Sequence, residues 1–289
     1  MPELPEVETY VRALKPLLDG KTILEAEVRW PRTIAAPDAS LFPDLVRGRC
    51  FASFHRRGKY MLFGLDSSEW LIVHLRMTGE LRIHKPAGQQ VEHDSAPVDS
   101  AALLPASTSD KHTHVIFQLD TGEELRFRDT RKFGRIWLVT DKETVVGKLG
   151  PEPLDAEFLP QHLEERLARR TANIKSLLLN QSIIAGVGNI YADEALFRAR
   201  IDPRRAAGRL NAGEIVRLHQ GLRDVLQAGI EAQGSSLQNY APPTGGKGGF
   251  QEQFQVFRRG GKPCFRCNAP ISRIVLGQRS THFCPECQK

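Results

Sequence analysis

The sequence has no long apolar run and nothing that resembles a signal peptide. Apolar stretches such as 177–179 and 183–185 are far too short to span a bilayer, which takes roughly 20 residues. The first dozen residues include the charged side chains Glu3, Glu6 and Arg12, with no apolar segment between them. We therefore expect a soluble, cytoplasmic protein with no membrane partner.

Cysteine is almost missing outside the last 26 residues, where four of the five cysteines lie. The remaining one, Cys50, is interpreted as a small, partly buried apolar residue and not as a nucleophile. Without an export signal, paired cysteines at short spacing favour a metal site over disulfides.

Two CxxC pairs separated by sixteen residues are within the range of four-cysteine zinc sites. Because four thiolates complete a tetrahedron and leave no open position, the sequence predicts one structural Zn²⁺ ion. Its expected ligands are Cys264, Cys267, Cys284 and Cys287.

The rest of the composition is that of an ordinary globular protein. The chain has 289 residues, 40% of them hydrophobic and 26% charged, which allows two domains and a small appendage. The formal net charge is +6 and the sequence pI about 9.2. This basicity is modest evidence for a polyanionic partner, because Lys and Arg displace counterions from phosphates.

Apolar spacing predicts a β-rich first part. A helix is expected from Pro5 to Gly20, and the period then changes to two. That alternation would place four apolar residues on one face of a strand: Leu24, Ala26, Val28 and Trp30. Further strand-like segments follow without intervening helices, which favours an antiparallel sandwich or barrel. They are 60–65, 70–75, 115–119, 124–127 and 135–139.

Beyond the Gly-Pro segment 149–153, which we interpret as a hinge, the apolar period becomes helical up to Ile230. The stretch 85–110 is rich in Ala, Ser, Pro and Asp and is interpreted as an inserted surface loop. A second, glycine-rich loop is expected between Ser236 and Phe250.

The segment Gly186–Tyr191 lies between two predicted helices. Its glycines allow a tight turn, and Asn189 could cap the helix that follows. Exposed amides at a helix N-terminus suit a phosphate. Any helix–helix turn can contain Gly and Asn, so this motif alone is weak.

The N-terminus offers a candidate nucleophile. Removal of the initiator Met would leave Pro2 with a free secondary amine, and α-amino groups have a pKa of about 7.7–8.0. Amines form Schiff bases with carbonyl-like carbons, and the neighbouring Glu3 could supply or accept protons. Met-Pro-Glu is also a common way to begin a helix.

Together these features resemble the formamidopyrimidine-DNA glycosylases. The residues that carry the resemblance are the opening Met1–Thr9, the turn, the terminal finger, and the segments 56–60, 74–79, 129–134 and 149–153. The resemblance covers nearly the whole chain. It implies a bifunctional glycosylase and AP lyase of base-excision repair, monomeric, acting on double-stranded DNA in the bacterial cytoplasm and nucleoid.

The implied fold is α+β. It comprises a catalytic antiparallel β-sandwich with an N-terminal helix at 1–138 and a hinge linker at 139–150. A helix–two-turn–helix domain with the lesion-recognition loop follows at 151–249, and a zinc finger at 250–289.

The family's catalytic residues correspond to Pro2, Glu3 and Lys59. The resemblance implies that Pro2 attacks the anomeric carbon, that Glu3 protonates the sugar ring oxygen, and that Lys59 contacts the phosphates near the lesion. Both phosphates would then leave by successive elimination.

Chemistry on a base requires the nucleotide to be flipped out, and the resemblance assigns the vacated space to Met77, Arg131 and Phe133. Phe133 would wedge between base pairs, and Arg131 would read the orphaned cytosine. The family's phosphate contacts correspond to His74, Asn189 and Arg279. Two positions depart from the family's pattern in the wedge loop: Thr130 and Lys132.

Two other readings are kept beside excision of oxidised purines such as 8-oxoguanine and formamidopyrimidines. One is an endonuclease VIII-type glycosylase for oxidised pyrimidines, which Leu4-Pro5 and the wedge residues disfavour. The other is a non-enzymatic damage sensor, which the presence of Pro2, Glu3 and Lys59 disfavours. The finger could likewise be a folding staple that does not contact DNA.

Overall fold

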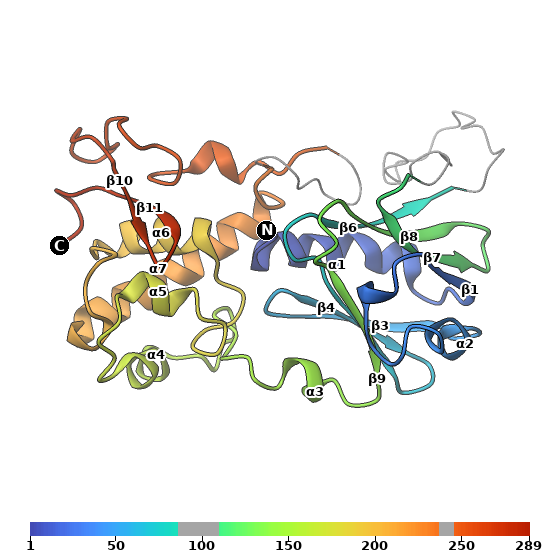
Figure 1. Ribbon diagram of the computed structural model, residues 1–289. Helices are drawn as coiled ribbons and strands as arrows, with labels where there is room; N and C mark the ends of the chain where they lie inside the picture. The colour runs from blue at the N-terminus through green and yellow to red at the C-terminus, as the bar shows by residue number, and fades with distance from the viewer. Residues whose placement is uncertain (86–109, 237–245) are drawn as a thin grey trace. The chain divides into compact units, whose positions relative to one another are not determined.

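The computed structural model describes residues 1–85, 110–236 and 246–289 (Figure 1). They form two compact units. The first contains residues 1–2, 6–85, 110–147, 236 and 246–248, and the second contains residues 3–5, 148–235 and 249–289. Residues 86–109 of the inserted loop expected at 85–110 lie outside the described residues, as does most of the predicted glycine-rich loop.

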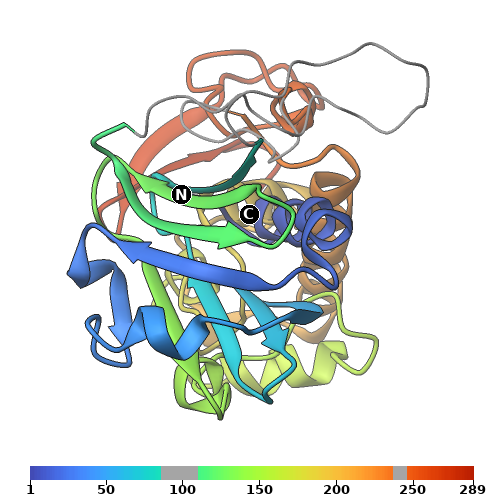
Figure 2. The same cartoon turned by 90° about the vertical axis from the view of Figure 1, so that its right-hand side faces the viewer.

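Two β-sheets form the body of the first unit. The five-stranded sheet has the order β2-β9-β5-β4-β3, and the four-stranded sheet has the order β1-β7-β8-β6. In Figure 2 the four-stranded sheet lies in the upper part of this unit and the five-stranded sheet in the lower part. The strands are β1 (Ile23–Val28), β2 (Ile34–Ala36), β3 (Phe51–Arg57), β4 (Tyr60–Leu65), β5 (Trp70–His74), β6 (Gly79–His84), β7 (Thr113–Leu119), β8 (Glu124–Asp129) and β9 (Arg135–Val139).

The predicted α+β class and the sandwich are confirmed, with one difference in strand direction. β2 pairs with β9 in parallel, through Ile34 opposite Ile136, so the larger sheet is mixed and not purely antiparallel. The two strands are far apart in sequence. Because no hairpin turn joins them, nothing in the local pattern sets their relative direction.

The prediction that Leu24 lies on the apolar face of β1 is wrong. Leu24 is 53% exposed, whereas Ile23 and Ala26 are buried. The pairing of β1 with β7 shifts register between Ile23 and Glu25. Such a bulge places two residues opposite one, so the side chains before it and after it alternate in opposite phase.

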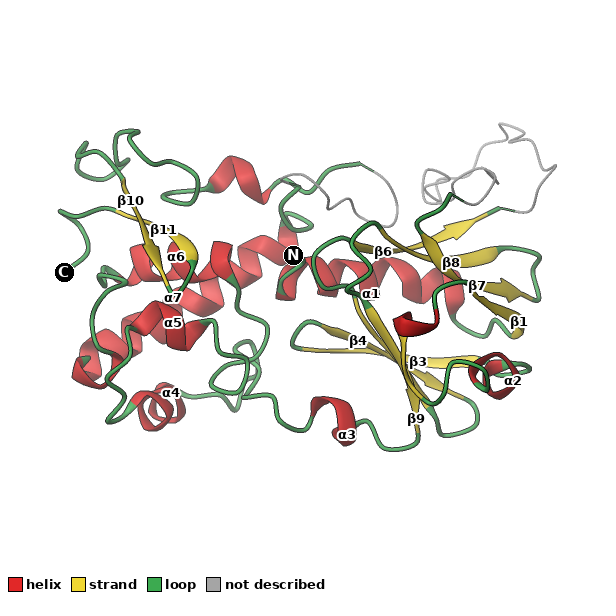
Figure 3. Ribbon diagram, in the orientation of Figure 1, coloured by secondary structure: helices red, strands yellow, loops and turns green. Residues whose placement is uncertain are grey.

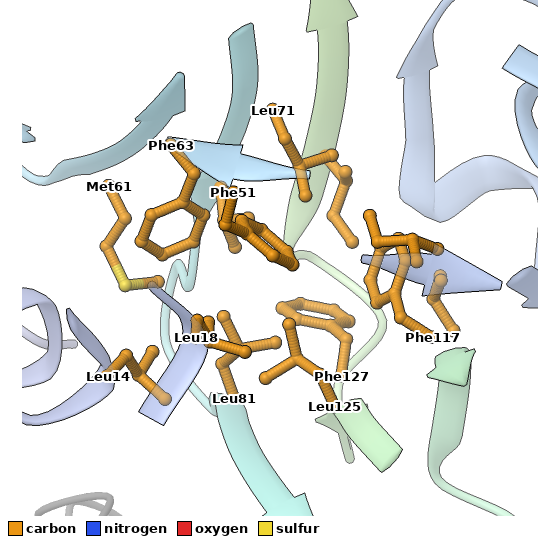
Figure 4. Close-up of a cluster of buried hydrophobic side chains, with 14 of the residues drawn as sticks. Leu14, Leu18, Phe51, Met61, Phe63, Leu71, Leu81, Phe117, Leu125 and Phe127 are labelled. Carbon is orange, nitrogen blue, oxygen red and sulfur yellow. The ribbon is translucent and has the colours of Figure 1, made fainter. Parts of the chain in front are cut away.

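Helix α1 (Leu4–Leu18) packs one apolar face into the core of the first unit. It contributes Leu14 and Leu18, and the two sheets contribute aromatic and aliphatic side chains that Figure 4 shows converging on the same space. The sheet residues labelled there are all fully buried: Phe51, Met61, Phe63, Leu71, Leu81, Phe117, Leu125 and Phe127. The core therefore fixes the helix that begins two residues after Pro2.

Helices dominate the second unit, as the apolar period predicted (Figure 3). The longest, α7, begins with a capping box, in which the backbone N–H of Asn211 and that of Glu214 each donate to the other residue's side chain at 2.9 Å. Within the described ranges, no helix has the length and hydrophobicity needed to cross a bilayer. The elements are α4 (Pro160–Leu167), α5 (Ile174–Leu178), α6 (Asn189–Ala199), α7 (Ala212–Glu231) and the hairpin β10 (Ser272–Leu276) and β11 (Arg279–Phe283); the short helices α2 (Phe42–Val46) and α3 (Glu143–Val146) lie in the first unit.

We predict that Phe127→Ala lowers the free energy of unfolding of the first unit by about 3–5 kcal/mol, because it removes a buried ring and leaves a cavity. Urea denaturation followed by circular dichroism measures the change. Val275→Ala, at a side chain that is 69% exposed, is the control and should stay within about 0.5 kcal/mol of wild type. A loss below about 1 kcal/mol for Phe127→Ala would contradict the importance of this packing.

Candidate active site

Glu3 is held at the start of helix α6. Its carboxylate accepts hydrogen bonds from the backbone N–H of Ile190 (3.1 Å) and of Tyr191 (3.4 Å), and only 4% of the residue is exposed. The backbone N–H of Leu4 donates to the carbonyl of Gly186 at 3.0 Å. The amides at the start of a helix point outward and attract a carboxylate, so the first turn of α6 holds the side chain of Glu3 in one position.

The glycines of the turn are required by the closeness of the N-terminal segment. A Cβ on Gly188 would lie 2.2 Å from Cδ of Glu3, and a Cβ on Gly186 would lie 2.7 Å from the side chain of Leu4. Gly186 also has φ of +81°, a conformation that side chains disfavour. The turn is therefore shaped around residues 3 and 4.

The prediction that Asn189 caps α6 is wrong. Gly188 is the N-cap, and Asn189 is the first helical residue. The Nδ2 group of Asn189 instead donates to the carbonyl of Ser280 at 3.0 Å. The amides expected to be free for a phosphate are bonded to Glu3, because a carboxylate of the chain itself occupies the anion site.

Pro2 and Lys59 belong to the first unit, and both are buried. Lys59 lies in the turn between β3 and β4. Arg56 fixes this turn by donating to Glu8 of α1 at 2.9 Å and to the carbonyl of Gly58 at 3.2 Å. The turn that carries Lys59 is thus tied to the helix that follows Pro2.

The three predicted wedge residues lie together on the surface of the first unit. Nη1 of Arg131 is 3.2 Å from Sδ of Met77, and the guanidinium carbon of Arg131 is 4.9 Å from the ring centre of Phe133. Met77 is 38% exposed and Phe133 is 48% exposed. The cluster therefore presents two apolar side chains and a cation to solvent.

Asp129, which the sequence analysis did not single out, organises the loop that carries Arg131 and Phe133. It is fully buried, and its carboxylate accepts from the backbone N–H of Arg131 (3.1 Å) and of Gly134 (2.7 Å) and from the hydroxyl of Thr78. An aspartate that bonds the backbone two residues on is a recognised turn signal, and that signal could have identified it.

His74 is buried, with 5% exposed, and its Nδ1 accepts a hydrogen bond of 2.9 Å from the backbone N–H of Arg76. The ring proton is therefore on Nε2. Burial, together with the charges of Arg76 and Lys59, lowers the pKa of His74 to about 3. At neutral pH His74 is an uncharged N–H donor.

A buried ion pair, also missed from the sequence, attaches the finger hairpin to the helices of the second unit. Nζ of Lys175 lies 2.7 Å from Asp193 and donates to Ser280 O and to Thr281 Oγ1, both at 2.8 Å. Asp193 also accepts from the backbone N–H of His282 at 2.9 Å. Burial lowers the pKa of Lys175, and the charge of Asp193 opposes that shift. This network holds β11, whose first residue is the exposed Arg279.

The four clustered cysteines fit a zinc ion. The Sγ atoms of Cys264, Cys267, Cys284 and Cys287 all lie within 4.8 Å of one another. Tetrahedral coordination with Zn–S bonds of about 2.3 Å needs sulfur atoms roughly 3.8 Å apart. Backbone N–H groups of the CxxC turns point at two of the sulfurs, each at 3.4 Å, and would stabilise thiolates. The predicted structural zinc site is thus confirmed.

Cys50, by contrast, is an isolated thiol. It is partly buried, and burial raises its pKa, with the charge of Asp66 adding to the shift. A reactive cysteine needs a lowered pKa, so these properties agree with the interpretation of Cys50 as a structural residue.

Three family models match the chain. They are the formamidopyrimidine-DNA glycosylase N-terminal domain at residues 1–136, the formamidopyrimidine-DNA glycosylase H2TH domain at 149–241, and the zinc finger found in FPG and IleRS at 261–289. Among curated proteins, the formamidopyrimidine-DNA glycosylase of Heliobacterium modesticaldum is 45% identical over the full length of both chains. That of Herpetosiphon aurantiacus is 44% identical, also with full coverage.

Solved structures agree with these matches. MutM (Fpg) of Thermus thermophilus is 39% identical, with a TM-score of 0.83 over 99% of this chain and 98% of that one. A complex of Lactococcus lactis Fpg with DNA that contains an abasic site gives a TM-score of 0.86 at 33% identity, with 99% of each chain covered.

We predict that Gly188→Ala lowers the rate of cleavage of abasic-site DNA by about 100-fold, because the new Cβ displaces the carboxylate of Glu3. A shift of about 1 Å in a catalytic group can lower a reaction rate by this factor. Gly213→Ala is a matched control, since its Cβ would meet nothing closer than Asn211 Oδ1 at 3.4 Å. Steady-state cleavage assays of both variants give the comparison. Wild-type cleavage by Gly188→Ala would show that the position of Glu3 does not matter.

We also predict that stripping zinc with a chelator weakens DNA binding by roughly 10- to 100-fold, the equivalent of losing one charged contact. The measurement is fluorescence anisotropy on abasic-site duplex, with zinc content determined in parallel. Cys50→Ser, which leaves the four ligands intact, should retain zinc and affinity. Full affinity in the zinc-free protein would mean that the finger has no part in holding DNA.

Proposed function

Because the chain belongs to the formamidopyrimidine-DNA glycosylase family of DNA-repair enzymes, which are DNA glycosylases with AP lyase activity, we propose that it excises oxidised purines through a Schiff base on Pro2. The observation that carries this proposal is the carboxylate of Glu3 bound to the first amides of α6. An acid–base group is thereby fixed at the residue next to the nucleophile. Family membership also makes DNA the partner of the chain.

In the proposed reaction, loss of Met1 frees the secondary amine of Pro2, and α-amino groups with a pKa of about 7.7–8.0 are roughly 10–20% unprotonated at pH 7. The amine attacks the anomeric carbon as the bond to the base breaks, and the departing base takes a proton from solvent. Glu3 accepts the proton of the new ammonium and passes it to the ring oxygen of the sugar, so the ring opens and the nitrogen becomes an iminium.

The iminium makes neighbouring sugar protons acidic, which drives strand cleavage. Loss of one such proton expels the 3′ phosphate, loss of a second expels the 5′ phosphate, and hydrolysis of the iminium frees Pro2. Lys59 would contact these phosphates. Its burial in a turn fixed by Arg56 supports an ammonium held in one place.

We propose that the wedge cluster fills the space of the flipped nucleotide. Phe133 would separate base pairs and Met77 would pack beside it, while Arg131 would donate to the orphaned cytosine. Their exposure and mutual contacts support these roles, as does the anchoring of the loop by Asp129.

His74, Asn189 and Arg279 are proposed as phosphate contacts of different kinds. His74 would donate as a neutral N–H group, and Asn189 through an amide that already contacts the finger strand. Arg279 would be a full charge at the start of β11, so it should contribute most to the salt dependence of binding.

We also propose the four-part division of the chain into a catalytic domain (1–138), a hinge linker (139–150), a helix–two-turn–helix domain (151–249) and a zinc finger (250–289). We propose that the protein is a monomer, and that it acts on oxidised bases in double-stranded DNA in the bacterial cytoplasm and nucleoid.

Borohydride trapping tests the proposed function. Incubation with a duplex carrying 8-oxoguanine opposite cytosine should give a covalent adduct, because borohydride reduces the iminium. Protein with a blocking tag fused before Pro2 should give none, and protein with the same tag fused after Lys289 provides the control for bulk.

Two outcomes would contradict the proposal. No adduct with any damaged duplex would remove the covalent mechanism. A clear preference for a duplex with an oxidised pyrimidine would assign the chain the specificity of the endonuclease VIII type.

A further inference from the structure

The zinc end of the finger exposes an aromatic ring that the proposed function does not use. Phe265, inside the first CxxC turn, is 68% exposed. The guanidinium carbon of Arg259 lies 3.4 Å from the centre of its ring. Arg259 is itself held by donating to the carbonyls of Gln255 and of Pro263, the latter at 2.7 Å. A fixed cation thus covers one face of the ring, and much of the ring remains open to solvent.

The charged residues near this ring in the sequence are all positive. Between residues 258 and 273 there are five Arg and Lys residues and no Asp or Glu. Arg258, Lys262 and Arg266 are exposed. Arg266 is also fixed in place, because it donates to Phe197 O at 2.9 Å and its guanidinium carbon lies 4.1 Å from the Phe197 ring centre. We call Arg258, Arg259, Lys262, Phe265 and Arg266 the Phe265 platform.

The Phe265 platform is separate from Arg279. In the hairpin β10–β11 (Figure 1), Ser272 pairs with Phe283 at the zinc end and Leu276 pairs with Arg279 at the other end. Four steps along a strand, at about 3.3 Å each, span about 13 Å. A ligand on the platform therefore need not displace a phosphate bound at Arg279.

We propose that the Phe265 platform is a second nucleic-acid site, which takes an unpaired base of single-stranded DNA on the open face of Phe265. Every base offers a flat π-face to an exposed aromatic ring, and neighbouring cations pair with the adjoining phosphates. Arg258 and Lys262 would supply those charges. An acidic peptide would be attracted by the same charges, but its carboxylates gain nothing from the negative π-face of the ring, on which every base can stack.

The test uses zinc-loaded protein whose lesion site is first filled with a duplex that contains an uncleavable abasic-site analogue. A short labelled oligothymidylate is then titrated, and binding is followed by fluorescence anisotropy. We expect Phe265→Ala to weaken oligothymidylate binding by about 5- to 100-fold, the loss of one base–aromatic stack. Phe265→Tyr should keep the affinity, because it keeps the ring.

Three controls separate the platform from other effects. Leu159→Ala removes an apolar side chain that is 49% exposed outside the finger and should change nothing. Zinc content and cleavage of abasic-site duplex should be unaffected in Phe265→Ala, which would show that the finger is folded. Arg279→Ala should weaken binding of the duplex while leaving oligothymidylate on the platform.

The proposal is overturned if the filled protein does not bind oligothymidylate or if Phe265→Ala binds it as tightly as wild type. It is also overturned if an acidic peptide binds the platform and oligothymidylate does not, because the partner would then be a protein. None of these outcomes bears on lesion excision, which borohydride trapping tests independently.

Discussion

The carboxylate of Glu3 lies against the first backbone amides of α6, and the turn before that helix is shaped by this contact. It fills the positive end of a helix that would otherwise attract a solvent anion. The turn before the helix must lack side chains at Gly186 and Gly188, because residues 3 and 4 occupy the space where Cβ atoms would lie. One short segment thus determines the sequence of a turn that is more than 180 residues away.

Buried charge has a comparable role at the finger. Lys175 and Asp193 are both removed from solvent, an arrangement that is costly unless each charge is paired and hydrogen-bonded. Their partners are the backbone and side chains of residues 280–282, so the charges are satisfied only while β11 stays in place. Zinc fixes one end of the finger and this network fixes the hairpin. Arg279 and the Phe265 platform are therefore presented from a rigid support.

In the second unit charged groups are buried, whereas in the first unit some large apolar side chains are exposed to solvent. Met77 and Phe133 remain exposed although a large core is available nearby, because the loop that carries Phe133 is fixed by the buried carboxylate of Asp129. A Cβ at Gly134 would lie 2.4 Å from the Phe127 ring, so the loop also rests directly on the core. Exposed apolar groups on a rigid loop are suited to insertion into a partner.

The sequence alone determined the α+β class, the helical second part and the zinc ligands, because apolar periodicity and cysteine spacing are local signals. Motifs that resemble a known family also pointed to Glu3 and to the three residues proposed as the wedge. Only the tertiary structure decided the parallel pairing of β2, the exposure of Leu24, the partner of Asn189 and the importance of Asp129, Lys175 and Asp193. Each of these depends either on a contact between residues that are distant in the chain or on the register of a strand. The spacing of neighbouring side chains determines neither distant contacts nor register.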